Sequence, residues 1–357
     1  MAAIKPGDIE LYNSAEFFLD IYKEYDMEKL PQWVKENIGQ AKVYGNQKKC
    51  VILPDGRKYH LDNKLNDMTG KDWTLFIKSV FTAHYPTKGH EAYAHEIRKI
   101  HPSPKPPQLM RDLISFFTKE GELVFDAFMG VGGTLLGAAL CKRRAVGIDL
   151  NQKFLDAYIA AANKLELEVF PTKCGDSLKV LQDNKLMYEL LGEEKISLYL
   201  IDPPYANMMS KKKTGADMYV YGDMATPFTD SPADLGNMER EEFLCALKES
   251  VESILPYMKK EGYVVIFIKD LQPLKKEVNF LHAEVANKIN EIPKLYYKGM
   301  KIWVDESTKL YPYGYPFSFV ANQTHQYIRY RQTNPLIIQP HHYGRIDYSY
   351  HFAKLPA

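Results

Sequence analysis

The chain has little of three things that often assign a protein quickly: net charge, cysteine and long apolar runs. Lys and Arg number 46 against 45 Asp and Glu in 357 residues, a formal charge of +1. The net charge therefore gives no indication of a nucleic-acid partner, and any basic surface that binds one must be local. The four cysteines are widely spaced and form no Cys-x-x-Cys pair. That disfavours a disulfide framework or a zinc ribbon and predicts a reducing, cytoplasmic location.

Membrane and metal signals are equally sparse. No apolar run reaches the roughly 18 residues that a membrane span needs, and Lys5, Asp8 and Glu10 stand where a signal peptide would be apolar. His90, His95 and His101 are accompanied by no Cys or acid cluster at ligand spacing, so we expect ordinary histidines and no metal. What is present is a 45% hydrophobic, 25% charged composition, which predicts a packed globular core.

The apolar pattern changes along the chain. Residues 1–40 show helical spacing, and residues 51–61, around Pro54-Asp55-Gly56, are predicted to form a hairpin. From about residue 120, short β-rich runs alternate with amphipathic helical stretches. The runs are 123–126, 145–149, 196–201 and 263–268. Such doubly buried strands predict a mostly parallel sheet flanked by helices. We therefore expect an N-terminal helical and hairpin extension (1–95), a main α/β domain (96–335) and a tail (336–357).

Polar residues follow three of the predicted strands. Asp126-Ala127-Phe128-Met129-Gly130-Val131-Gly132 is a glycine loop that matches neither a GxGxxG fingerprint nor a P-loop. Asp149 ends the next strand, where a carboxylate can accept both ribose hydroxyls. Asp176, in Cys174-Gly175-Asp176-Ser177, ends the strand that comes after that of Asp149, and it could accept from an adenine amine. A turn or a helix cap would explain each feature alone, but together they predict a nucleoside cofactor site.

The most specific motif is Asp202-Pro203-Pro204-Tyr205, directly after the apolar run 196–201. Two prolines stiffen the backbone and remove two N–H donors, which leaves a turn of acceptors. The Asp202 carboxylate and the Pro203 carbonyl suit the two hydrogens of an exocyclic amine on a planar ring. Gripping those hydrogens would free the nitrogen lone pair for attack, by positioning and electrostatic preorganisation. A proline-stiffened turn with a buried tyrosine is the alternative.

These motifs resemble the S-adenosylmethionine-dependent amino-methyltransferases of DNA. The resemblance rests on Asp-Pro-Pro-Tyr, on Phe128-x-Gly130-x-Gly132 and on the upstream segment His101–Pro107, and it covers roughly residues 98–270. It implies a Rossmann-like class I methyltransferase fold with S-adenosyl-L-methionine as cofactor and DNA as substrate. The cofactor contacts that it implies are Lys105, Asp126, Phe128, Gly130, Gly132, Asp149, Leu150, Asp176 and Ser177. It implies that Asp202, Pro203, Pro204 and Tyr205 hold the target amine, with Tyr205 stacking on a base flipped out of the duplex.

The chain departs from the family pattern in two places. The usual Asp-Pro-Phe of the glycine loop is Asp126-Ala127-Phe128 here, and no large domain separates that loop from Asp202. Target recognition must then come from residues 1–100, from the loop 206–237 or from the C-terminus. Lys211, Lys212 and Lys213 in that loop could neutralise phosphates beside the target, or form an ordinary solvated run.

The resemblance leaves several substrates open. We expect methylation of adenine N6, because Asp at the first position of the motif leans towards adenine, although cytosine N4 uses the same chemistry. Cytosine C5 is disfavoured because it needs a thiolate, usually in a Pro-Cys pair, and no cysteine here follows proline. An RNA or protein amine methyltransferase and a non-catalytic nucleic-acid-binding module are the rival interpretations. A cognate restriction endonuclease is a further partner that the resemblance suggests.

Overall fold

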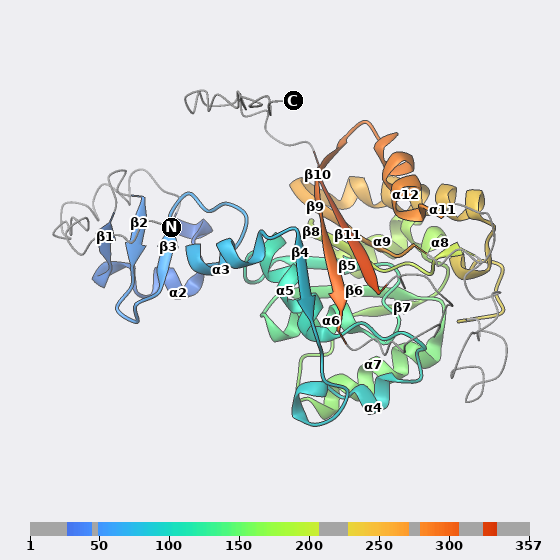
Figure 1. The fold of residues 1–357 in the computed structure, drawn as a ribbon, viewed down its shortest axis with the longest axis horizontal. Helices are drawn as coiled ribbons and strands as arrows, with labels where there is room; N and C mark the ends of the chain where they lie inside the picture. The colour runs from blue at the N-terminus through green and yellow to red at the C-terminus, as the bar shows by residue number, and fades with distance from the viewer. Residues whose placement is uncertain (1–26, 45–48, 207–227, 271–278, 307–323, 334–357) are drawn as a thin grey trace, which may run out of the picture.

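The computed structural model describes residues 27–44, 49–206, 228–270, 279–306 and 324–333 in two units, a small three-stranded sheet and a large eight-stranded one (Figure 1). Several sequence-based expectations lie outside the described residues. These are the helical pattern before residue 27, Lys211–Lys213 with most of the loop 206–237, and the tail 336–357.

The small unit contains the predicted hairpin. Its elements are η1 (Met27–Lys29), α2 (Gln32–Lys35), η2 (Ile38–Gln40), β1 (Lys42–Tyr44), β2 (Cys50–Ile52) and β3 (Lys58–His60). β2 pairs antiparallel with both neighbours, which confirms the hairpin. Gly56 takes φ +82° at the turn, a conformation that glycine adopts without a Cβ penalty. Val34, Val51 and Tyr59 belong to a separate apolar core beneath this sheet.

The large sheet has the strand order β4-β10-β11-β9-β8-β5-β6-β7. Its strands are β4 (Val80–Ala83), β5 (Leu123–Asp126), β6 (Arg144–Asp149), β7 (Thr172–Cys174), β8 (Ile196–Ile201), β9 (Met258–Ile268), β10 (Leu295–Asp305) and β11 (His325–Thr333). Only β11 runs antiparallel to its neighbours, so the expected mostly parallel sheet is confirmed. β4 comes from the segment expected to be an extension, yet it pairs with β10 as the edge strand of this sheet.

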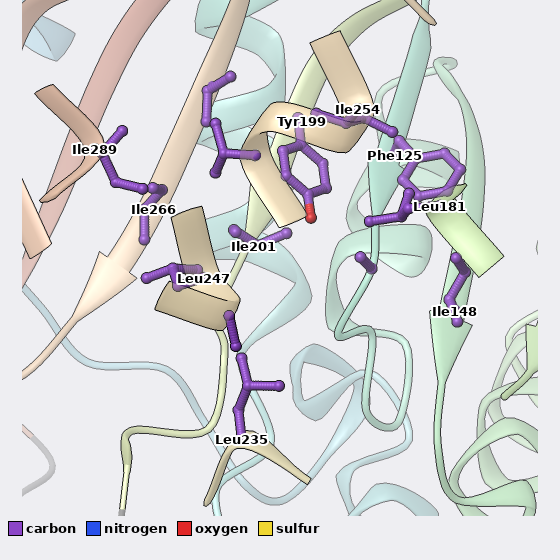
Figure 2. Packing of buried hydrophobic residues seen from close by; sticks show 14 of the residues in the cluster. Phe125, Ile148, Leu181, Tyr199, Ile201, Leu235, Leu247, Ile254, Ile266 and Ile289 are labelled. Carbon is purple, nitrogen blue, oxygen red and sulfur yellow. The ribbon is translucent and has the colours of Figure 1, made fainter. Parts of the chain in front are cut away.

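Helices cover both faces of the large sheet. They are α3 (Gly70–Phe76), η3 (His90–Ala92), α4 (His95–Arg98), α5 (Pro107–Phe117), α6 (Gly133–Leu140), α7 (Gln152–Lys164), α8 (Ser177–Gln182), α9 (Asn184–Leu191), η5 (Leu235–Asn237), α11 (Arg240–Ile254), η6 (Leu255–Tyr257) and α12 (Leu281–Asn290). β9 alternates between the two cores: Ile266 packs with the layer of α8, α9, α11 and α12 (Figure 2), and Phe267 packs with that of α5, α6 and α7. This period of two fixes which side chains reach each layer.

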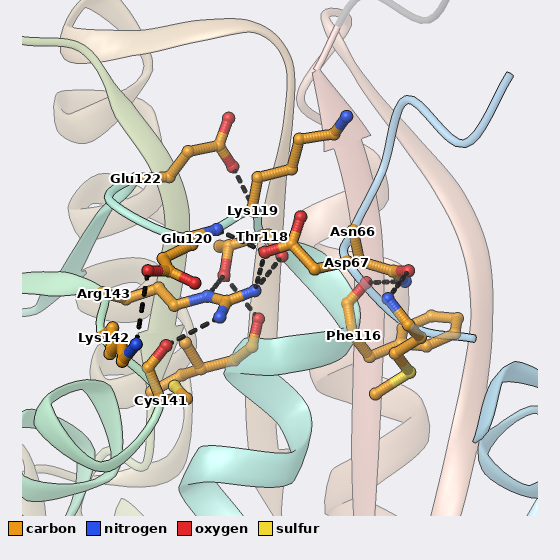
Figure 3. Close-up of polar contacts among 12 residues, drawn as sticks. Asn66, Asp67, Phe116, Thr118, Lys119, Glu120, Glu122, Cys141, Lys142 and Arg143 are labelled. Atoms are coloured by element: carbon orange, nitrogen blue, oxygen red, sulfur yellow. Dashed lines mark hydrogen bonds and ion pairs between the residues drawn. The ribbon is translucent and has the colours of Figure 1, made fainter. Parts of the chain in front are cut away.

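A buried polar network joins the two units (Figure 3). Arg143, directly before β6, donates from Nη2 to Asp67 Oδ2 at 2.8 Å and to the carbonyl of Thr118 at 2.8 Å. Asn66 Nδ2 donates to the carbonyl of Phe116 at 2.7 Å. Because the Arg143 and Asp67 side chains are only 6% and 10% exposed, this contact is an internal ion pair that holds the small unit against the large one.

Candidate active site

A pocket of about 200 Å³ lies beyond the carboxyl ends of β5, β6 and β8. Ligands of open α/β sheets bind at this edge. The predicted residues that line it are Lys105, Phe128, Gly130, Asp149, Leu150, Asp176, Ser177, Asp202, Pro203, Pro204 and Tyr205. The fold thus brings the two groups of residues expected to hold the cofactor and the amine to one cavity.

Asp126 and Gly132 shape the glycine loop below this pocket. Asp126 is 2% exposed and accepts from the Phe128 N–H at 2.9 Å and from Thr134 Oγ1 at 2.5 Å. Burial raises the pKa of its carboxyl to about 7 against the lowering effect of those hydrogen bonds. Gly132 has φ +75°, and a Cβ there would come within 2.2 Å of the Tyr158 ring. Asp126 therefore holds the loop through its hydrogen bonds, and Gly132 allows the loop to pack against the Tyr158 ring.

Asp149 lies against the loop from the neighbouring strand. Its Oδ2 accepts from the Gly130 N–H at 2.8 Å and its Oδ1 from the Asn151 N–H at 2.9 Å. Burial raises the pKa of this carboxyl to about 6, while the backbone hydrogen bonds oppose the rise. Each oxygen keeps a second lone pair, so the carboxylate can also accept hydrogen bonds from a diol.

Asp176 is both a lining residue and a helix cap. Its side chain accepts from the Leu178 N–H at 3.1 Å at the start of α8, and Lys179 Nζ lies 3.4 Å from its Oδ2. Ser177 Oγ donates to the carbonyl of Ala127, which ties the start of α8 to the glycine loop. Asp176 therefore caps α8, which is the role that would explain a single acid at this place, and it also lines the pocket.

The pocket residues fit S-adenosylmethionine. Asp149 and Asp176 supply acceptors for hydroxyl and amine hydrogens, and Phe128 and Phe154 supply apolar wall beside them. At Gly130, a Cβ would approach the His101 ring to 3.3 Å, so glycine keeps open the space between the loop and this ring. A pair of carboxylates that accept hydrogen bonds, beside aromatic and glycine surface, suits a nucleoside.

The Asp202 carboxylate is held on both oxygens. Lys105 Nζ lies 2.6 Å from Oδ2, and the Tyr205 hydroxyl donates to Oδ1 at 2.5 Å. The side chains of Lys105 and Asp202 are 9% and 18% exposed, so this ion pair is largely shielded from water. Burial and the neighbouring carboxylate raise the pKa of Tyr205 well above its usual range, which keeps its hydroxyl protonated. The structure thus fixes the orientation of the Asp202 carboxylate by two donors.

The sequence did not assign site roles to several pocket residues, among them Phe154, Phe228, Lys269 and Gln326. His101, which the sequence marked only as part of the segment 101–107, stacks on Phe228 at 4.8 Å and meets Phe154 edge-on at 4.9 Å. Burial lowers the pKa of His101 to about 4, so the ring is neutral at pH 7. No local pattern in the sequence indicated this arrangement.

Metal clusters and membrane spans are both absent from the described residues. Within them, no group of three or more His, Cys, Asp or Glu side chains is arranged to hold a metal ion. Over the same ranges of the chain, no helix has the length and apolar character to cross a membrane.

Known proteins match parts of the chain. Residues 7–161 match the DNA methylase family. Type II methyltransferase M2.DpnII of Streptococcus pneumoniae is 33% identical over 136 residues, 38% of this chain and 41% of that protein. The tRNA (guanine(10)-N2)-dimethyltransferase of Methanocaldococcus jannaschii is 29% identical over 144 residues, 39% of each chain. Among solved structures, TrmN from Thermus thermophilus aligns at 12% identity and TM-score 0.44, over 68% of this chain and 53% of that one.

Each of these sequence matches covers less than half of the chain. The chain spans about two fifths of the length of the two curated relatives named above. The family match includes the glycine loop and Asp149 but ends before Asp202. The family match and the type II relatives agree on one similarity: part of the chain resembles the N6/N4 amino-methyltransferase family of DNA methylases.

Proposed function

We propose that the protein transfers a methyl group from S-adenosylmethionine to the exocyclic N6 amine of adenine in DNA. One observation carries the proposal: the Asp202 carboxylate opens into the same pocket as Asp149 and Asp176. An amine acceptor and a nucleoside site therefore share one cavity, as methyl transfer between them requires. The similarity to type II methyltransferases supports DNA as the substrate.

The residues of the chain would act by binding and positioning. The bound cofactor supplies a methyl group made electrophilic by its sulfonium. The Asp202 carboxylate and the Pro203 carbonyl would accept the two amine hydrogens and leave the nitrogen lone pair directed at that methyl group. With the amine held in this way, its nitrogen would accept the methyl group as the carbon–sulfur bond of the cofactor breaks, and the amine proton would leave to water.

Lys105 and Tyr205 occupy the Asp202 oxygens that would accept the amine hydrogens. Since they already donate to the two Asp202 oxygens, an arriving amine must share or replace one of these contacts. Lys105 has the longer and more flexible side chain of the two donors, so it could turn towards an anionic group of a bound cofactor. Tyr205 keeps its ring at the pocket wall, where it could stack on a flipped base.

Two other substrates share this chemistry. The N4 amine of cytosine presents the same pair of hydrogens. Transfer to an amine in RNA is favoured by one specific observation, the similarity to the tRNA (guanine(10)-N2)-dimethyltransferase. A cognate restriction endonuclease would accompany the protein if it serves a modification system.

The test is a labelled-methyl assay with unmethylated genomic DNA, total RNA and protein extract offered separately. We expect label in DNA, recovered as N6-methyladenine after digestion. Asp202→Ala should abolish transfer, and Asp202→Asn, which retains one acceptor oxygen, should keep part of it. Label in RNA alone would select the second candidate. Transfer by Asp202→Ala at the wild-type rate would refute the assigned chemistry.

A further inference from the structure

A cleft of about 870 Å³ lies between the small unit and the amino ends of strands in the large sheet. One wall comes from residues between 28 and 35 together with Lys64 and Leu65, and the other from the segment 117–122 and the start of β9. The active-site pocket lies at the opposite, carboxyl ends of the parallel strands. The cleft is therefore a surface separate from the residues assigned to methyl transfer.

Positive side chains predominate around this cleft. Six lysines and four glutamates line it. The lysines are Lys35, Lys64, Lys119, Lys142, Lys259 and Lys260. Lys142 lies 3.8 Å from Glu120. Lys64 and Lys260, by contrast, are exposed and make no ion pair within the described part of the chain. The rim of the cleft therefore carries positive charge that an acidic partner would neutralise.

Apolar side chains also line the cleft. Leu65 and Tyr263 are half-buried there, and the Tyr263 ring packs on the buried Phe117 ring with centroids 5.0 Å apart. Leu30 extends this apolar surface from the side of the small unit. Apolar surface with a rim of lysines suits an amphipathic segment whose polar face is acidic.

Residues 1–26, which precede the described chain, have this pattern in their sequence. They contain six acidic residues against two lysines. Apolar residues recur at intervals of four and three, the spacing of one face of a helix: Leu11, Ala15, Phe18, Tyr22 and Tyr25. Glu16, Asp20 and Glu24 recur at intervals of four and would fall on the opposite face of such a helix. The segment is therefore complementary to the cleft in both apolar pattern and charge.

The connectivity of the chain brings this segment to the cleft. It ends at Asp26, two residues before Glu28, which lines the cleft. The tail 334–357 also begins nearby, because Gln332 is another lining residue. However, this tail carries two basic residues and one acid. A rim of lysines disfavours that composition and favours the acidic N-terminal segment.

We propose that residues 9–25 fold back into this cleft as an amphipathic helix. The apolar face, centred on Phe18, packs on Leu65 and Tyr263. The acidic face lies between the lysines of the rim, whose long side chains reach over it. The docked helix joins the two units beside the polar network of Figure 3, part of which lines the cleft. The inference is independent of the proposed methyl transfer.

Hydrogen–deuterium exchange of the full chain tests the docking. We expect the amides of residues 11–25 to exchange more slowly than in an isolated peptide of the same segment. In the Lys64→Glu/Lys260→Glu variant their exchange should accelerate about tenfold, because two attractive charge contacts become repulsive. The matched control is Lys153→Glu/Lys185→Glu, which changes the net charge equally at two exposed lysines of α7 and α9. It should leave the exchange unchanged.

A second pair of variants tests the apolar face. Phe18→Ala removes the side chain at the centre of the apolar pattern, so exchange of the segment should accelerate about tenfold or more. Phe17→Ala removes the same side chain one position earlier, about 100° around the helix axis, and should have little effect. Equal acceleration by both variants would contradict the proposed face.

Three results of the exchange experiment would overturn the inference. If residues 11–25 exchange as fast as the isolated peptide, the segment does not dock. If their exchange is slow but equal in the cleft variant and its control, the segment is ordered elsewhere. If the cleft variant instead accelerates exchange in residues 334–357 and the control does not, the tail occupies the cleft.

Discussion

Arg143→Met tests whether the network in Figure 3 stabilises the whole molecule. The substitution keeps much of the side-chain volume but removes four hydrogen bonds: Nε to Thr118 Oγ1 at 3.2 Å, Nη1 to the Cys141 carbonyl at 2.7 Å, and Nη2 to Asp67 and the Thr118 carbonyl at 2.8 Å. It leaves the buried carboxylate of Asp67 without its cation. Breaking a buried ion pair in this way costs about 3–5 kcal/mol of unfolding free energy.

The measurement is urea unfolding followed by circular dichroism, with Arg144→Met as the control. Arg144 is adjacent, but its pair with Glu194 has side chains 55% and 30% exposed, so its loss should cost about 0–1 kcal/mol. The difference between the variants should shrink at low pH. Burial raises the pKa of Asp67 and Arg143 lowers it. In the Arg143→Met variant, Asp67 should therefore become protonated at a higher pH, and the cost of burying an unpaired carboxylate is then lost. Equal costs below about 1 kcal/mol for both variants would refute the reasoning.

Three further predictions concern the site. Tyr205→Phe keeps the ring but loses the hydrogen bond to the Asp202 carboxylate. Methyl transfer should therefore fall about tenfold, as one hydrogen bond allows; a thousandfold loss in the labelled-methyl assay would contradict this. Gly132→Ala should cost about 2–4 kcal/mol in urea melts, from φ +75° and the clash with Tyr158, whereas Gly39→Ala, in open space, should cost far less. The pKa of His101 is about 4 in the folded state and roughly 6.5 in the unfolded state, so the free energy of unfolding should fall by up to about 3 kcal/mol as the pH drops from 6.5 to 4. The His101→Phe variant should lack this part of the pH dependence. If both proteins show the same pH profile, His101 does not contribute to it.

The strand ends of the site were predictable because local pattern determines them. Apolar runs of strand length locate β5, β6 and β8, and the residue after each run must lie at one edge of a parallel sheet. The sequence alone therefore assigns Asp149 and Asp202 to one edge, and both line the same pocket. The roles of these residues remain predictions, since the geometry brings them together without a ligand.

Contacts between segments far apart in the chain could not be predicted from local sequence patterns. The pairing of Lys105 with Asp202 joins a loop before β5 to the end of β8, and no periodicity reports it. Phe228 meets His101 for the same reason, through a loop whose path the sequence does not encode locally. The pairing of β4 with β10 was not predicted either, because a strand of only four residues, none of them fully buried, gives no apolar run.

The edge position of β4 also has a consequence for the synthesis of the chain. Val80 pairs with Ile302, so the strand leaves the ribosome roughly 220 residues before its partner, a delay of about 10–45 s at 5–20 residues per second. During that interval its backbone N–H and C=O groups have no sheet to join, and Leu75, Ile77 and Val80, more than half exposed even in the finished fold, stand beside it. The small N-terminal unit, with its own core, can fold in that time, whereas the β4 edge of the large sheet forms among the last events of folding.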